Sequence, residues 1–221
     1  MMEQLPGYLI SPAIFMAIYL FHKYRHPKSN HMLLVQAFFW GVWMIIPVIL
    51  IDQAAHYLMI DGARSIRRMI AYSFVFVAFV YQISVFLPLR FSVLRKMRHK
   101  TPSTGILYAV VITLGLTSIY AIYYSLLGNK SGLSEHFFWS MGPVSMAIAV
   151  ITGFFTGLGD IRKNQFIDSM TGLGAATVFL GIYRFSLLSS DVLLFWMFVT
   201  VTVFISFILF RKSLQKTAEQ H

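Results

Sequence analysis

The sequence predicts an all-α membrane protein, a bundle of about seven transmembrane helices. Of its 221 residues, 57% are hydrophobic and 16% aromatic, whereas only 12% are charged, and the mean hydropathy is +0.70. A soluble domain usually has about twice this share of charged residues. Several apolar runs reach the roughly 20 residues that an α-helix needs to cross a bilayer. These runs lack the alternating pattern of outer-membrane β-strands, which excludes a β-barrel from the prediction.

Polar or charged residues bound most of the predicted helices. The first apolar segment is interpreted as a retained helix, because Glu3 stands where a signal peptide carries Lys or Arg and no small-residue cleavage site follows. The connections are too short for a separate domain, so residues 1–221 are expected to form one integral membrane domain. In chain order the predicted spans are 5–21, before a basic loop; 32–51, before Asp52; 69–89, before Arg90 and the basic cluster RKMRHK; 105–127; 137–158, before Asp160; 166–188, which contains Arg184; and 192–210, before Arg211.

Charge asymmetry predicts that the N-terminus lies outside and the C-terminus inside. In this orientation 13 Lys and Arg residues fall on the cytoplasmic side and 4 on the outside, while Arg184 lies within a span. Cytoplasmic loops of membrane proteins carry such an excess. Arg64, Arg67 and Arg68 run against the trend, and an interfacial helix within residues 52–68 is one explanation for them. The cluster RKMRHK is interpreted as a topology anchor near anionic lipid.

Charge and cysteine usage exclude two other classes of function. The net charge of +10 is attributed to the basic cytoplasmic loops, so no nucleic-acid partner is expected. The chain has no cysteine, which excludes disulfides and thiolate metal sites.

Ionisable residues are scarce within the predicted spans. Arg184 is the clear exception, and the favoured interpretation is that its side chain snorkels to the membrane interface and pairs with Asp191 or Asp52. The alternative is a charge that lines an internal cleft. All seven histidines fall in loops, at span ends or in the C-terminal tail, and no Asp or Glu is expected well inside a span. The membrane interior is therefore predicted to lack acid–base chemistry.

Glycines in the later spans form small-xxx-small patterns that allow two helix backbones to approach closely. Packing within the bundle is favoured over homodimerisation as their role. The glycines assigned to helix packing are Gly153, Gly157, Gly172, Gly174 and Gly181.

The order of these features resembles the PrsW family of intramembrane proteases, which belongs to the CAAX-protease-like superfamily. The resemblance covers residues 38–185, leaving 192–210 as an additional C-terminal helix. Four segments carry it, each by small and aromatic framework residues: AFFWGVWMIIPVILID, GILYAVVITLGLTSIYAIYY, PVSMAIAVITGFFTGL and FLGIYRF. It implies a helical membrane protein in which Glu and His side chains from separate helices form a metal site, and it implies a bacterial inner-membrane location.

The framework persists in this sequence, but the residues that would carry the chemistry do not. The family's paired glutamates fall on Tyr81 and Gln82, which lie side by side in the apolar run FVFVAFVYQISVFLPLR. The degenerate site or cleft that the resemblance predicts consists of Tyr81, Gln82, Val85, Tyr120, Ser145, Leu180 and Arg184. We expect Tyr81, Gln82, Tyr120, Ser145 and Arg184 to converge on one cleft.

These replacements predict that the site is inactive. A catalytic zinc usually takes three His or carboxylate ligands plus a water molecule. Tyr, Gln, Ser and Leu do not hold zinc in that arrangement at neutral pH, so no catalytic residue, metal or cofactor is expected. Gln82 is expected to form a hydrogen bond with a neighbouring helix, worth about 0.6–2 kcal/mol.

The function expected from this resemblance is that of a pseudoprotease, a catalytically inactive homologue that acts as a binding or scaffold subunit. Its expected partners are the lipid bilayer and another membrane protein or transmembrane helix. Two alternatives remain open. One is an active PrsW-type metalloprotease with non-standard ligands, such as His56 and His136. The other is a small transporter or lipid-handling protein in which Arg184 meets an anionic substrate, although no inverted repeat is found.

Overall fold

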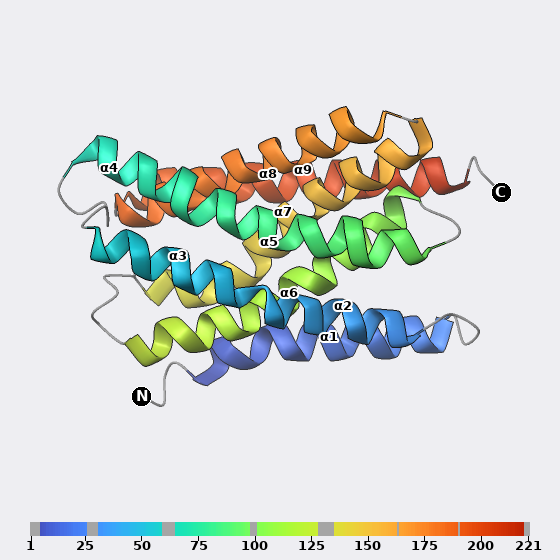
Figure 1. The fold of residues 1–221 in the computed structure, drawn as a ribbon, viewed down its shortest axis with the longest axis horizontal. Coiled ribbons are helices and arrows are strands. Elements are labelled where there is room, and N and C mark those ends of the chain that lie inside the picture. The colour runs from blue at the N-terminus through green and yellow to red at the C-terminus, as the bar shows by residue number, and fades with distance from the viewer. Residues whose placement is uncertain are drawn as a thin grey trace.

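The computed structural model describes residues 5–25, 31–58, 65–97, 101–127, 135–162, 164–189 and 191–218. Its helices lie side by side along the long axis of the molecule, with α1 and α2 on one side and α8 and α9 on the other (Figure 1). In chain order the elements are α1 (Leu5–Arg25), α2 (His31–Trp43), α3 (Ile45–Tyr57), α4 (Ile66–Ala71), the π-helix η2 (Tyr72–Phe79), α5 (Val80–Leu87), the π-helix η3 (Pro88–Val93), the 3₁₀ turn η4 (Leu94–Lys96), α6 (Pro102–Leu127), α7 (Glu135–Arg162), α8 (Gln165–Leu188) and α9 (Val192–Ala218).

Six helical runs among the described residues are long and apolar enough to cross a membrane, which confirms the prediction of a helical membrane protein. They correspond to the second to seventh predicted spans, and the first predicted span lies within α1. The orientation of the bundle remains a prediction. The six runs are His31–Tyr57, Ile66–Lys96, Pro102–Tyr123, Ser140–Gly159, Gln165–Leu188 and Val192–Lys216.

Two of these runs change geometry near a proline. Pro47 has no amide hydrogen, and its ring conflicts with the carbonyl four residues earlier, at Trp43. The run His31–Tyr57 accordingly breaks at Met44, where α2 ends and α3 begins. In the next run, Pro88 stands at the first position of η3, and α5 therefore lies between two π-helical segments.

The described residues of the range 52–68, in which an interfacial helix was expected, belong to the ends of two spanning runs. α3 continues through Tyr57, and a new run begins at Ile66 after an N-cap at Ser65, whose side chain accepts a hydrogen bond from the Arg68 amide. Arg67 and Arg68 therefore lie on the first turn of a spanning run. The residues between, 59–64, lie outside the described part of the chain.

Glycines let α6 approach its neighbours α7 and α2 closely. A methyl group on Gly153 of α7 would lie 2.6 Å from the Gly105 carbonyl oxygen of α6, and one on Gly157 would lie 2.7 Å from the Thr101 carbonyl oxygen. On another face of α6, a methyl group on Gly41 of α2 would lie 2.0 Å from the Ile112 carbonyl oxygen. These glycines are places where the backbones of two helices touch.

On α8 the predicted packing glycines divide into two groups. Methyl groups on Gly172 and Gly181 would collide with Phe155 of α7 and Phe74 of η2, at 2.7 Å and 2.5 Å. A methyl group on Gly174 would meet nothing within 4 Å. The packing role assigned to Gly174 was therefore wrong, because this glycine lies on the outer face of α8.

Candidate functional site

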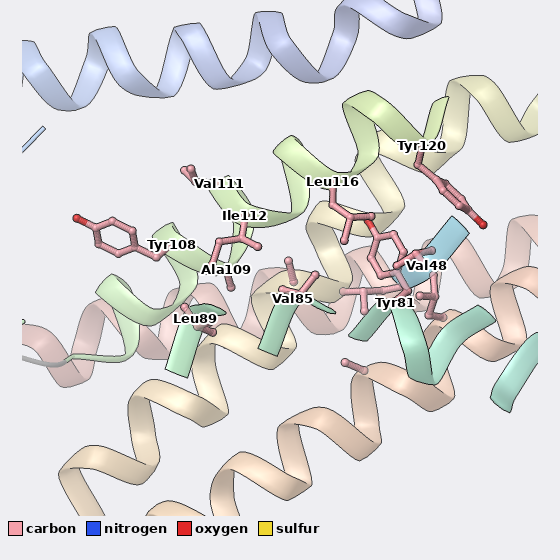
Figure 2. Close-up of a cluster of buried hydrophobic side chains, with 14 of the residues drawn as sticks. Val48, Tyr81, Val85, Leu89, Tyr108, Ala109, Val111, Ile112, Leu116 and Tyr120 are labelled. Carbon is pink, nitrogen blue, oxygen red and sulfur yellow. The ribbon is translucent and has the colours of Figure 1, made fainter. Parts of the chain in front are cut away.

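The residues of the predicted degenerate site come from four helices and are all buried. Tyr81, Gln82 and Val85 lie on α5, Tyr120 on α6, Ser145 on α7, and Leu180 and Arg184 on α8, and none is more than 3% exposed. Figure 2 shows Tyr81 beside Val48 of α3 and Leu116 of α6, near the Tyr120 side chain. The rings of Tyr81 and Tyr120 meet edge to face, with their centroids 6.1 Å apart.

Arg184 is held inside this cluster by an aromatic hydroxyl. Its Nη2 donates a hydrogen bond of 2.7 Å to the Tyr120 hydroxyl, and its guanidinium carbon lies 5.6 Å from the centre of the same ring. The prediction that Arg184 snorkels to the interface was wrong, because the side chain turns inward and is only 3% exposed. Asp191, one of its expected partners, is exposed and caps α9 by accepting hydrogen bonds from the amides of Leu193 and Leu194.

A carboxylate that the sequence reasoning placed at a helix end also lies in the interior. Asp52 is 2% exposed and accepts a hydrogen bond of 2.6 Å from the Tyr72 hydroxyl of η2. Tyr72 interacts electrostatically with both Asp52 and Arg184. The interior of the bundle thus holds an acidic and a basic side chain in one polar region, which we call the Asp52–Arg184 cluster: Asp52, Tyr72, Tyr81, Tyr120, Ser145 and Arg184.

The burial of Asp52 follows from the face of α3 on which it lies. The buried residues of α3 are Ile45, Val48, Asp52 and Ala55, which recur at the three- and four-residue spacing of one helix face. Because the predicted span ended at residue 51, Asp52 and Ala55 fell outside it. The prediction that no Asp lies well inside a span was therefore wrong.

Two hydroxyl groups complete the cluster. The hydroxyls of Tyr81 and Ser145 lie near each other, but neither forms a hydrogen bond of ordinary geometry with a described residue. Nearby, the Tyr183 hydroxyl of α8 lies 2.7 Å from the Ser140 hydroxyl of α7. Four helices are thus joined in this region by aromatic and polar side chains.

Gln82 lies apart from the other predicted residues. Its Oε1 accepts a hydrogen bond of 3.2 Å from Thr152 Oγ1 of α7, seven residues or about 10 Å along the helix from Ser145. Of the five residues expected to converge, the structure brings together Tyr81, Tyr120, Ser145 and Arg184. They meet in the packed interior rather than on an open surface.

Val85 and Leu180 contribute no polar groups. Both belong to the main apolar core, with exposures of 0% and 3%. These two positions of the predicted site therefore carry packing residues.

The residues at the cluster do not fit a zinc ion. The phenol and serine oxygens of the cluster are poor zinc ligands. The Arg184 guanidinium beside Tyr120 also repels a divalent cation electrostatically. Among the described residues, no group of three or more His, Cys, Asp or Glu side chains could hold a metal. His56, one of the alternative ligands, is exposed with its ring 5.8 Å from the Tyr72 ring, and the side chain of His136 lies outside the described part.

Comparison with known proteins identifies no relative. No protein-family model matches the chain, and neither curated proteins nor solved structures give a match.

Proposed function

We propose that this protein is a catalytically inactive, PrsW-like member of the membrane protease superfamily that binds a partner membrane protein as a scaffold subunit. The observation that carries the proposal is the meeting of Tyr81, Tyr120, Ser145 and Arg184. The resemblance assigns these four positions, on four different helices, to one catalytic centre. Each of the four helices turns the position that the resemblance assigns toward the same region of the interior.

The chemistry of the cluster favours holding helices together over catalysis. Bringing a guanidinium and a carboxylate out of water costs several kcal/mol for each ion unless hydrogen bonds and opposite charge compensate. Here Tyr120 and Tyr72 supply such bonds to Arg184 and Asp52. Groups engaged in this way fix the arrangement of α3, η2, α6 and α8, which suits a rigid binding subunit.

The experiment combines a zinc determination with capture of partners. The tagged protein is purified from its native membrane in mild detergent, and zinc, peptide-bond cleavage of added transmembrane substrates and co-purifying proteins are measured on one sample. We expect less than about 0.1 zinc per chain, no cleavage, and one or more membrane proteins at a fixed ratio to the chain.

Variants connect the captured partner to the cluster. Tyr81→Phe with Ser145→Ala removes two buried hydroxyls that form no ordinary hydrogen bond, so the fold should persist. In this proposal a partner helix enters the bundle at the cluster when it binds, because the cluster itself does not reach the surface. We therefore expect partner recovery to fall at least about fivefold. Ser186→Ala is the matched control, since its hydroxyl bonds only within α8, to the Tyr183 carbonyl. Stoichiometric zinc with chelator-sensitive cleavage would support the active-protease alternative and contradict the proposal. Unchanged recovery with the double variant would also contradict it.

A further inference from the structure

The outer face of α2 carries an apolar groove of about 430 Å³. Its lining residues recur at the three- and four-residue spacing of one helix face, while Gly41 on the opposite face packs against the α6 backbone. Met32, Phe39 and Trp43 in the groove are 64%, 55% and 65% exposed, so the groove faces away from the bundle. The lining residues of this α2 groove are Met32, Val35, Gln36, Phe39, Trp40 and Trp43.

The length of the groove matches one leaflet of a bilayer. From Met32 to Trp43 the helix rises about 16 Å, at 1.5 Å per residue, which is close to half of a hydrocarbon core about 30 Å thick. The groove starts in the first turn of the spanning run His31–Tyr57 and ends where the helix breaks at Met44. A single acyl chain of one leaflet would run along it.

Two tryptophans occupy the deep end of this groove. Trp residues of membrane proteins are enriched at the membrane–water interface, but Trp40 and Trp43 lie close to the middle of the 27-residue run. Broad, rigid indole rings at this depth offer a large contact surface to an apolar chain.

The shallow end of the groove is basic. Lys96 Nζ donates a hydrogen bond of 3.4 Å to Oε1 of Gln36, which lines the groove. Arg95 is its neighbour, and both cations are exposed. Neither α2 nor the segment Pro88–Lys96 contains Asp or Glu, so no acidic side chain of these two segments neutralises the pair. An apolar groove that is one leaflet long, with cations at its outer end, is complementary to an anionic lipid.

We propose that the α2 groove binds an anionic phospholipid, with one acyl chain along Phe39, Trp40 and Trp43 and the phosphate at Lys96 and Arg95. The site selects lipid by headgroup charge, because the apolar groove itself does not distinguish lipids with identical chains. This inference does not depend on the proposed function.

The test uses tryptophan fluorescence in a background with Trp139→Phe and Trp196→Phe, which leaves Trp40 and Trp43 as the only tryptophans. The protein is reconstituted into phosphatidylcholine vesicles that contain a small fraction of either brominated phosphatidylglycerol or brominated phosphatidylcholine with identical chains. We expect brominated phosphatidylglycerol to reach half-maximal quenching at a mole fraction about fivefold lower than brominated phosphatidylcholine does. This is the preference expected from one basic side chain near the membrane surface, which contributes about 1 kcal/mol.

Charge variants test the headgroup site. Arg95→Gln with Lys96→Gln should abolish the preference, and high salt should weaken it. Lys212→Gln, an exposed basic residue of α9 at the same end of the bundle (Figure 1), should leave it unchanged. All three substituted residues are exposed, so thermal unfolding should change little.

Three outcomes would overturn the proposal. The first is equal quenching by the two brominated lipids, and the second is a preference that survives loss of both cations. The third is a loss of tryptophan quenching by both brominated lipids as the protein concentration rises. That result would mean that a second copy of the chain covers the groove.

Discussion

At the scale of single residues, the polar side chains of the interior decide how the bundle is held together. Tyr72 donates to Asp52, and Arg184 donates to Tyr120. Each of these hydrogen bonds involves an ionisable partner, and such bonds contribute about 1.5–3 kcal/mol. Removing one partner leaves a buried group whose desolvation is no longer compensated, so the cluster should respond strongly to single substitutions.

Substitution of Asp52 tests this cluster. Asp52→Ala should lower the free energy of unfolding by about 1.5–3 kcal/mol, because it removes a hydrogen bond to a carboxylate and leaves the buried Tyr72 hydroxyl without this acceptor. Asp191→Ala, which removes an exposed helix cap, should cost about 0.5–2 kcal/mol. Both variants are compared with the wild type by thermal unfolding in the same detergent. If Asp52→Ala is no more destabilising than Asp191→Ala, the burial of Asp52 in the cluster is incorrect.

At the scale of elements, helix packing depends on where glycine occurs. α6 touches α2 through Gly41 and α7 through Gly153, in both cases with backbone against backbone. The Phe74 ring of η2 fills the space beside Gly181 of α8. A π-helical turn is wider than an α-helical one and often marks a functional site, and here η2 and η3 bracket the α5 residues Tyr81 and Gln82.

Alanine substitutions should distinguish, by their effect on stability, a glycine in a close helix contact from a glycine at an open position. We expect Gly153→Ala to destabilise the protein by about 1–3 kcal/mol, because the added methyl group must push two backbones apart. Gly174→Ala should be neutral or stabilise by up to about 1 kcal/mol, since the position is open and Ala favours helix. The difference is read from unfolding midpoints of the two variants in one detergent. Equal midpoints would contradict the close approach of α6 and α7.

At the scale of the whole molecule, basic residues gather at one end of the bundle. The end at which α2 begins and α9 finishes carries Lys23, Arg95, Lys96 and Lys212 among its described residues. This distribution is the basis of the predicted orientation, because cytoplasmic loops hold an excess of Lys and Arg.

Reporter fusions test the orientation. Green fluorescent protein fused after His221 should fluoresce, and alkaline phosphatase fused there should be inactive, because the C-terminus is expected in the cytoplasm. Alkaline phosphatase joined after Lys130 should be active as the matched control. Active phosphatase at the C-terminus would reverse the orientation.

The sequence alone determined the class of this protein and nearly all of its spans. Hydrophobic length is a local property, since about 20 apolar residues suffice to cross a bilayer whatever surrounds them. The positions of Tyr81, Tyr120, Ser145 and Arg184 in one region were also expected, from the resemblance to a known framework. The π-helical segments were not, because they reflect packing and proline geometry and not a recognisable residue pattern.

Only the tertiary structure decided which face of each helix points inward. In a soluble helix a polar face marks the outside, but a membrane helix is apolar on most of its faces. Composition therefore left open whether Arg184 reached the interface or the core, and whether Gly174 packed like Gly181. Those outcomes depend on how far each helix is rotated about its axis, and that rotation is set by contacts between segments distant in the chain.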